Sequence, residues 1–284
     1  MRLYLSWGYT LISGMAMAIA SNEPATNTDF DWDSVNPSTN LQYHNCYTEF
    51  QCARLILPMD WLDKKNQDNV TIAIIKRPAV VHDDDPSFGG TIFAQPGGPG
   101  VSGTMYGRKN GKRFQNMFDK PGKKHYEILS FDPRGMGHST PKINCFPGLL
   151  GYVRDLERIT IGNLDLNPET LAMAVAAAKA DGVQCDKVHG KYLSFVGTSD
   201  VARDIIAILD KIEELRQHEA NQREQSRLEL RSERKENLPR LQYIGISYGT
   251  QIGQFFASMF PGRVGRMVLD GVVDVVDATS GVVS

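Results

Sequence analysis

Short apolar runs separated by polar segments predict the strands of an α/β fold. Two β-branched runs, at 54–58 and 70–75, flank a polar turn and predict an antiparallel hairpin near the start of the chain. The apolar runs at 91–94 and 126–131 have no polar face, which is typical of strands covered on both sides. A helical segment at 103–118 separates them. Strand, helix and strand at this spacing predict a parallel βαβ unit.

The middle of the chain has the helical period. Asn167 followed by Pro168 starts a helix, because an N-cap residue precedes a proline in the first turn, and Gly182 is predicted to end it. A second helix begins near Thr198 and carries apolar residues on one face. The charged tract at 213–239 predicts a solvated helical insertion, since its opposite charges nearly cancel, with a partner-binding helix as the alternative.

The last third of the chain returns to the α/β pattern, with a strand at 241–246, a helix at 248–260 and a strand at 266–271. The first turn of this unit is Gly245-Ile246-Ser247-Tyr248-Gly249, which fits G-x-S-x-G. In a sharp turn from strand to helix, the serine of this motif is an exposed nucleophile. The two glycines remove side chains where strand and helix approach closely. We therefore predict that Ser247 is a catalytic nucleophile rather than a structural serine.

A serine hydroxyl needs a base to become nucleophilic at neutral pH. On the fold that uses this motif, an acid and then a histidine follow the serine. The six histidines all precede Ser247, at positions 44, 82, 125, 138, 189 and 218. Asp270, Asp274 and Asp277 are candidate carboxylates near a strand end, and His138 is a candidate replacement base because it also follows a strand.

Two further motifs follow strands. Pro96-Gly97-Gly98-Pro99-Gly100 presents backbone N–H groups, and such donors contribute about 3–4 kcal/mol each when they stabilise an oxyanion. A phosphate-binding loop is the weaker reading, because no G-x-x-x-x-G-K-[ST] occurs and Pro99 lacks a donor. In Asp132-Pro133-Arg134-Gly135 we interpret Asp132 and Arg134 as structural, with Arg134 fixing loops around the site. A direct catalytic role is the alternative.

Together with Phe260-Pro261-Gly262-Arg263 running into Val268-Leu269-Asp270-Gly271, these motifs resemble those of an α/β-hydrolase of the tripeptidyl-aminopeptidase and prolyl-aminopeptidase type. The resemblance extends from about residue 46 to the end of the sequence. It implies a mostly parallel sheet flanked by helices. It also implies that Ser247 is the nucleophile and that the backbone N–H groups of Gly98 and Tyr248 form the oxyanion hole.

The activity implied by the resemblance is release of short N-terminal peptides through an acyl-enzyme, with a peptide substrate and no cofactor. The acid and histidine of that family follow a lid domain, so we expect the chain to lack the lid and the last strands. Two alternatives stay open. One is a catalytically inactive family member that binds a peptide or partner, and the other is an esterase-type α/β-hydrolase.

Composition narrows the classes of function further. The chain has 284 residues, a net charge of -2 and 41% hydrophobic residues, which fit a globular protein with one large domain. The near-balanced charge argues against nucleic-acid binding, which would need a basic stripe. The chain has no paired C-x-x-C or H-x-x-x-H spacing that would indicate a metal site.

We assign 21–90 to an N-terminal arm with the opening strands and 91–284 to the N-terminal part of the catalytic domain.

The N-terminus resembles a secretory signal peptide cleaved after Ala20. Met1-Arg2 precedes a mostly apolar stretch, and Ala18-Ile19-Ala20 has small residues at the two positions that signal peptidase recognises before its cleavage site. Polar interruptions in this stretch argue against a membrane-spanning helix. A buried N-terminal helix and a membrane anchor are the alternatives. We therefore expect a secreted protein without stable membrane insertion.

Export makes the four cysteines candidates for disulfides. Pairing Cys46 with Cys52 and Cys145 with Cys185 is the most economical of the three possible connectivities. In an exported protein Asn69-Val70-Thr71 would also be a usable glycosylation site.

Overall fold

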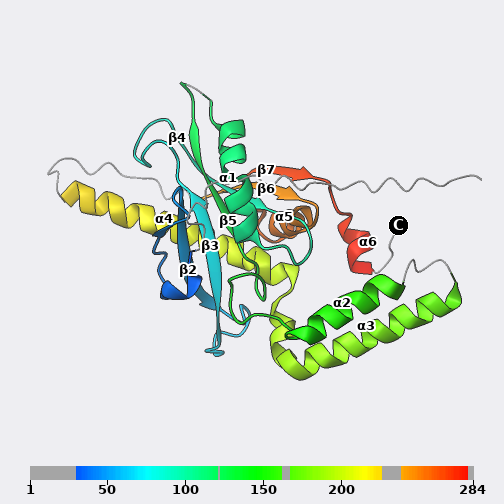
Figure 1. Ribbon diagram of the computed structural model, residues 1–284. Coiled ribbons are helices and arrows are strands. Elements are labelled where there is room, and N and C mark those ends of the chain that lie inside the picture. The colour runs from blue at the N-terminus through cyan, green and yellow to red at the C-terminus, as the bar shows by residue number, and fades with distance from the viewer. Residues whose placement is uncertain (1–29, 121, 162–166, 226–237, 281–284) are drawn as a thin grey trace, which may run out of the picture.

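The computed structural model describes residues 30–120, 122–161, 167–225 and 238–280. The strands in these ranges form one sheet in the order β1-β2-β3-β5-β4-β6-β7 (Figure 1). Their bounds are β1 (His44–Cys46), β2 (Phe50–Pro58), β3 (Asn69–Arg77), β4 (Phe88–Gln95), β5 (His125–Phe131), β6 (Leu241–Ile246) and β7 (Val264–Asp270). The predicted signal peptide lies outside the described residues.

The sheet is mixed, with an antiparallel and a parallel half. Neighbouring strands from β1 to β3, and β3 with β5, pair antiparallel, whereas β5–β4, β4–β6 and β6–β7 pair parallel. Five of the seven strands, β2 and β4 to β7, therefore run in the same direction. The predicted opening hairpin and the βαβ unit are confirmed, and the sheet is mostly parallel as expected.

Helices cover both faces of the sheet. The helices of the described ranges are α1 (Gly103–Phe118), α2 (Leu149–Ile161), α3 (Pro168–His189), α4 (Thr198–Gln225), α5 (Tyr248–Met259) and α6 (Val275–Ser280). Apolar residues of α4 and α5, such as Ile205 and Phe256, pack on one face against Leu55, Ile72 and Phe93. On the other face, α1 inserts Phe114 among residues of β4, β5 and β6. The two-sided cover explains why the central strands have no polar face.

Helix α1 lies unusually close to the strands beneath it. A Cβ at Gly103 would overlap the carbonyl oxygen of Phe131, and one at Gly107 would lie 2.7 Å from the Ser130 side chain. At its start, Ser102 caps the helix by accepting a hydrogen bond from the Met105 N–H. The bounds predicted for this helix, 103–118, are confirmed.

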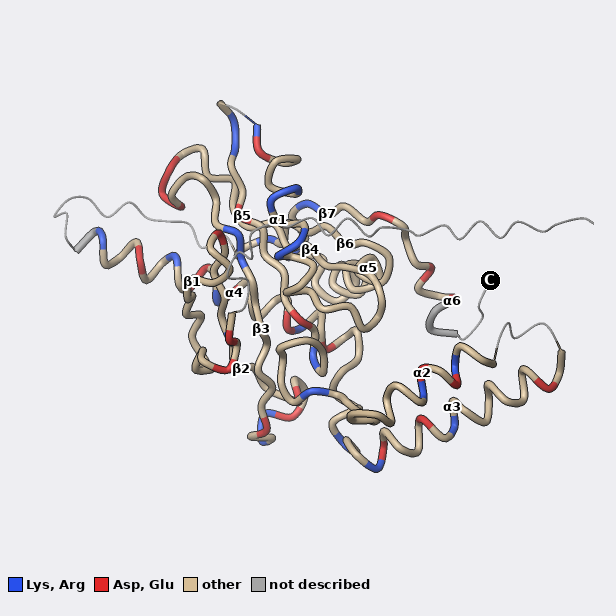
Figure 2. The backbone as a smooth tube through the Cα atoms, in the orientation of Figure 1, with Lys and Arg blue, Asp and Glu red and all other residues tan. Residues whose placement is uncertain are grey.

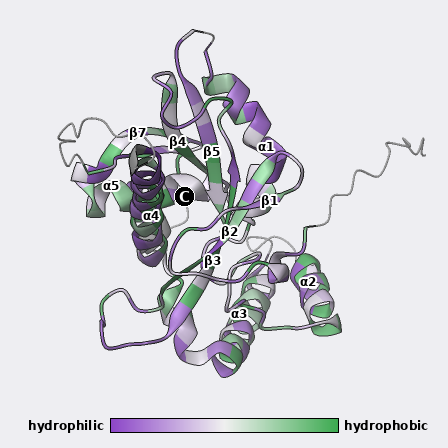
Figure 3. Ribbon diagram, turned by 90° about the vertical axis from the view of Figure 1, so that its left-hand side faces the viewer, coloured by the Kyte–Doolittle hydropathy of each residue, from purple (hydrophilic) through white to green (hydrophobic). Residues whose placement is uncertain are grey.

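Helices α2 and α3 form a hairpin that stands apart from the sheet (Figures 1 and 3). Arg154 of α2 donates to Asp181 of α3, and the Cys145–Cys185 disulfide ties the segment before α2 to α3. Helix α2 was not predicted from the sequence. The predicted end of the next helix at Gly182 is wrong. Helix α3 continues to His189, because a glycine such as Gly182 is tolerated inside an α-helix when the turns on either side continue. The helix ends at Gly190, which caps it with φ 47°.

The N-terminal part of the described chain packs against the sheet. Trp32 is buried in a 3₁₀ turn, in a small cluster with Cys46, Phe50 and Cys52. The Cys46–Cys52 disulfide bridges the β1–β2 hairpin, which was not predicted from the sequence. Both predicted cysteine pairings are confirmed.

The charged tract at 213–239, predicted to be a solvated helical insertion, is only partly solvated. Helix α4 extends through it to Gln225, with charges of both signs interspersed (Figure 2). However, Arg216 in this tract forms an ion pair with buried Glu127 at 2.6 Å, which fixes this part of the helix to the sheet. Residues 226–237 of the tract lie outside the described residues. No helix in the described ranges is long and apolar enough to cross a membrane.

Candidate active site

Ser247 lies at the turn between β6 and α5. Its backbone has φ 53° and ψ -120°, a conformation that L-residues rarely adopt, and its side chain is exposed. Such a backbone costs on the order of 1–3 kcal/mol and persists only where neighbouring structure enforces it. The exposed hydroxyl therefore stands at a strained strand-to-helix turn, as the G-x-S-x-G pattern predicts.

The two glycines of the motif are required by close backbone contacts. A Cβ at Gly245 would overlap the carbonyl oxygen of Gly249, and a Cβ at Gly249 would lie 2.5 Å from the carbonyl oxygen of Gln95. No side chain fits at either position. The elbow therefore packs directly on the end of β4, which carries the second motif.

The glycine-rich loop after β4 lies against Ser247. Strands β4 and β6 are parallel neighbours, with Gln95 opposite Gly245, so their carboxyl ends meet at the same edge of the sheet. A Cβ on Gly97 would lie 2.7 Å from the Cβ of Ser247 and 3.0 Å from its Oγ. In the described part of the chain, the N–H groups of Gly98 and Tyr248 donate to no protein acceptor. Two unengaged donors thus lie in the segments that adjoin this hydroxyl.

Hydrogen bonds to the end of β7 and to the segment after it hold the elbow. The Ser247 N–H donates to the Asp270 carbonyl at 2.9 Å. Thr250, which is fully buried, donates its hydroxyl to the Ser247 carbonyl at 2.7 Å and accepts from the Val273 N–H at 2.9 Å. The sequence analysis did not identify Thr250. The only available signal was its position one turn into the helix, within reach of the serine carbonyl.

Asp132 connects loops at the same edge of the sheet. It is fully buried and accepts from Ser102, from the N–H and hydroxyl of Thr104, and from the His138 N–H, all within 2.9 Å. Four donors occupy the carboxylate, so it has no room to accept a proton from a substrate. The structural interpretation of Asp132 is in keeping with these contacts.

Arg134 is a second structural residue, and its partners come from three parts of the chain. Its guanidinium is fully buried and pairs bidentately with Asp204 of α4, with Nε 2.7 Å from Oδ2 and Nη2 2.7 Å from Oδ1. It also donates to the backbone carbonyls of Pro58 and Phe195. The Trp61 indole N–H donates to the same Asp204 carboxylate at 3.0 Å. Arg134 therefore joins the β2 end, the segment before α4 and α4 itself.

His138 has a structural partner rather than Ser247. Its ring stacks on Trp32 with centroids 4.9 Å apart and planes 13° from parallel. Burial lowers the pKa of His138, against the opposing effect of Asp132, so the ring is neutral at pH 7. Among the described residues, no histidine is hydrogen-bonded to the Ser247 hydroxyl. The structure thus gives the replacement-base interpretation no support.

The candidate carboxylates lie at the end of β7 and in the segment after it. Asp270 ends β7 and contributes its carbonyl to the Ser247 N–H. Asp274 accepts from the N–H groups of Val276 and Asp277 and so caps the first turn of α6. Neither carboxylate is hydrogen-bonded to a histidine in the ranges that the structure describes.

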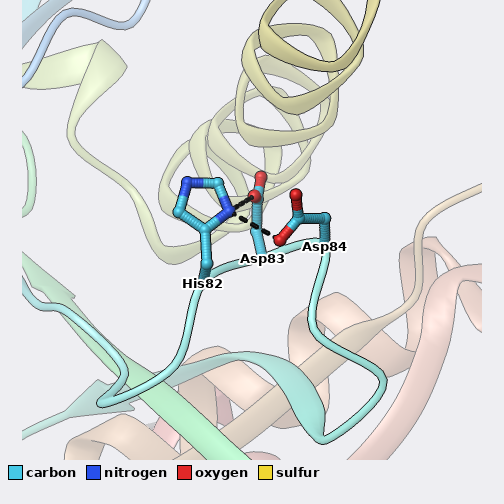
Figure 4. Close-up of side chains that lie close together, drawn as sticks. All are labelled: His82, Asp83 and Asp84. Atoms are coloured by element: carbon cyan, nitrogen blue, oxygen red, sulfur yellow. Dashed lines mark hydrogen bonds and ion pairs between the residues drawn. The ribbon is translucent and has the colours of Figure 1, made fainter. Parts of the chain in front are cut away.

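One cluster of possible metal ligands lies in the β3–β4 loop. His82, Asp83 and Asp84 place ligand atoms within 4.8 Å of one another (Figure 4). Arg223 of α4 donates to both carboxylates at 3.1 Å. Since the Arg223 guanidinium already binds both carboxylates, the cluster fixes the end of α4 to the loop.

Comparisons with known proteins agree with this geometry. The family described as "alpha/beta hydrolase fold" matches residues 90–280. The serine protease Hip1 of Mycobacterium tuberculosis (strain ATCC 25618 / H37Rv) is 31% identical over 225 residues, which are 78% of this chain and 36% of that protein. The tripeptidyl aminopeptidase of Streptomyces lividans is 27% identical over 266 residues, 92% of this chain and 41% of the relative.

A third relative is the carboxylesterase B of Mycobacterium tuberculosis (strain ATCC 25618 / H37Rv), which is 28% identical over 158 residues, 55% of this chain and 28% of the relative. The chain spans about two fifths or less of the length of these curated relatives.

Proposed function

This chain belongs to the α/β-hydrolase family, and from that premise we propose that Ser247 is the nucleophile of a secreted serine aminopeptidase that releases short peptides from N-termini. The observation that carries the proposal is the exposed Ser247 hydroxyl at φ 53°, with the Gly97 loop packed against it. The relatives named as serine protease and tripeptidyl aminopeptidase support the peptidase class.

In the proposed reaction, the Ser247 Oγ attacks the scissile carbonyl and forms a tetrahedral intermediate. The N–H groups of Gly98 and Tyr248 stabilise its oxyanion, because each follows a residue at the elbow or the loop packed on it and neither is used within the described fold. Collapse of the intermediate releases the shortened polypeptide and leaves the N-terminal peptide as an ester on Ser247. Water then hydrolyses this ester. The attack requires a base, which the family resemblance assigns to a histidine after the elbow.

Two observations support the proposal of secretion. The disulfides Cys46–Cys52 and Cys145–Cys185 are typical of proteins from oxidising compartments. Asn69 of the glycosylation tripeptide is exposed at the start of β3, as a glycosylated residue of an exported protein must be.

Two other functions remain candidates, each with one observation in its favour. An inert elbow in a peptide-binding protein is favoured by the lack of any histidine bonded to Ser247 among the described residues. An esterase is favoured by the relative named carboxylesterase B.

A labelling and cleavage experiment separates the three functions. We expect a fluorophosphonate probe to form a stable adduct on Ser247, located by peptide mass mapping. We also expect cleavage of a tripeptidyl anilide with a free amino group and not of its N-acetylated form. Cleavage of short acyl esters alone would indicate an esterase. If no adduct forms and no substrate is cleaved, the catalytic proposal is wrong.

Gly97→Ala is expected to slow fluorophosphonate modification of Ser247 about 100-fold, because the added methyl group lies 2.7 Å from the serine Cβ and must displace the nucleophile or the loop by about 1 Å. Rates of adduct formation measured by mass spectrometry check this. Gly182→Ala is the control, since a Cβ there meets nothing within 4 Å. Equal rates for the Gly97 variant and the unmodified protein would contradict the proposed geometry.

A further inference from the structure

A pocket lies at the opposite edge of the sheet from Ser247, where the parallel strands β4 to β7 begin. Its volume is about 340 Å³, and its lining comes from the first residues of these strands and from the residues just before β5 and β6. Strand β4 starts at this pocket with Phe88 and ends at Gln95, directly before the Gly97 loop. A strand of this length spans roughly 25 Å, so the pocket is separate from the candidate active site.

The pocket lies where two strand pairings are irregular. The register of β4 with β5 shifts between Phe88 and Thr91, and the register of β6 with β7 shifts directly after Leu241. A Cβ at Gly89 would lie 2.4 Å from the Tyr126 ring, so no other residue fits there. Such irregularities redirect side chains and are frequent beside functional sites.

Three cations line this pocket, and none of its lining residues is an acid. The Lys124 ammonium donates to the carbonyls of Pro86 at 2.7 Å and Phe88 at 3.3 Å. The Arg266 guanidinium donates to the Tyr126 hydroxyl at 3.3 Å. Since Phe88 and Tyr126 also line the pocket, both cationic groups lie beside it. Their acceptors are neutral and leave the two positive charges without a counter-charge.

Arg240 is the third cation of the lining. It is exposed, and within the described part of the chain its guanidinium makes no hydrogen bond or ion pair. The acids on the adjoining segments, Asp85, Asp119 and Glu127, are hydrogen-bonded to residues other than these cations. Hydrogen bonds from Ser87 lower the pKa of Asp85, and the charge of Lys124 contributes least to that shift. The pocket therefore keeps a positive excess.

The charge and the donors of the pocket suit one class of ligand group. A phosphate monoester carries a charge of about -1.5 to -2 at pH 7 and has three strong acceptor oxygens. A guanidinium binds two such oxygens at once through its planar fork of N–H groups. A carboxylate has a single charge and would balance less of the excess.

We propose that this pocket binds a phosphate group, whose oxygens accept hydrogen bonds from Arg240, Arg266 and Lys124. Free phosphate and a small organic phosphate share this chemistry, and the test distinguishes the two sources.

Isothermal titration calorimetry on the whole chain compares phenyl phosphate, phenyl sulfate and inorganic phosphate, at a pH well above the second pKa of a phosphate, which is about 6. Phenyl sulfate has a similar shape but a single charge, so we expect it to bind about 10-fold more weakly than phenyl phosphate. Equal affinity for inorganic phosphate and phenyl phosphate would identify the free ion as the ligand. Tighter binding of phenyl phosphate would identify an organic phosphate.

Arg240→Gln is expected to weaken binding of phenyl phosphate about 10-fold, because it removes a charge-assisted donor. The thermal midpoint of the ligand-free protein should not change, since the lost guanidinium has no partner in the described structure. Arg266→Gln should weaken binding similarly. Lys65→Gln, in the exposed loop between β2 and β3, is the matched control, because it removes one positive charge outside the pocket and should bind like the unmodified protein.

Three results would each overturn the proposal. The first is no binding of phenyl phosphate at millimolar concentration, and the second is equal affinity for phenyl phosphate and phenyl sulfate. The third is unchanged binding by Arg240→Gln, or the same weakening by Lys65→Gln, because the phosphate would then be bound elsewhere or attracted only by the general charge of the protein.

Discussion

Ser247→Ala is expected to abolish fluorophosphonate labelling and, in a protein that supplies the histidine base which the family resemblance implies, to lower the rate of peptide hydrolysis by about 10⁶-fold, the loss seen when a catalytic serine is removed from a serine protease. Alanine keeps the Cβ that packs near Gly97 but removes the hydroxyl that is the proposed nucleophile. Single-turnover hydrolysis of a tripeptidyl anilide and mass spectrometry of the labelled protein measure the two effects.

Ser258→Ala on the exposed side of α5 is the matched control. It removes a hydroxyl from the same helix and should leave both labelling and hydrolysis unchanged. The thermal midpoint of Ser247→Ala should equal or exceed that of the unmodified protein, since functional residues are often not optimal for stability. Hydrolysis by Ser247→Ala at a rate close to that of the unmodified protein would assign the activity to another residue.

Asp204→Asn is expected to destabilise the fold by about 3–5 kcal/mol, because it leaves the fully buried Arg134 guanidinium without its counter-charge. Asparagine is nearly isosteric and can still accept from Trp61 and Arg134, so the change tests charge rather than volume. The free energy of unfolding from urea titration, followed by tryptophan fluorescence, measures the effect.

Glu214→Ala on the same helix is the control for this substitution. Glu214 pairs with Lys211 through a largely exposed carboxylate, so its loss should cost about 0.5 kcal/mol or less. Similar costs for the Asp204 and Glu214 variants would show that burial of the Arg134 pair contributes little, contrary to the expectation.

The regular elements were predictable because their signals are local. The bounds of α1 and the starts of α4 and α5 follow from apolar period, caps and glycine positions in neighbouring residues. The segments where prediction was wrong or silent depend on distant contacts. Helix α3 runs past Gly182, and contacts with distant residues hold it there: Arg154 donates to Asp181, and a disulfide joins Cys185 to Cys145.

The charged tract is a second segment in which a local pattern did not predict a contact with a distant residue. By charge balance alone it predicts a solvated helix, and most of its described side chains are exposed. Arg216 differs because Glu127, 89 positions earlier, is buried directly beneath it. A pattern of alternating charge in one segment contains no information about an acid on another strand.

The sequence by itself determined the α/β-hydrolase architecture, the Ser247 motif and the glycine-rich loop, because each depends on residue types at short fixed spacing. Only the tertiary structure decided that Gly97 adjoins Ser247, that Thr250 and Asp270 hold the elbow, and that Arg134 pairs with Asp204. These contacts join segments up to 150 positions apart and follow from the strand order of the sheet, which no local pattern encodes.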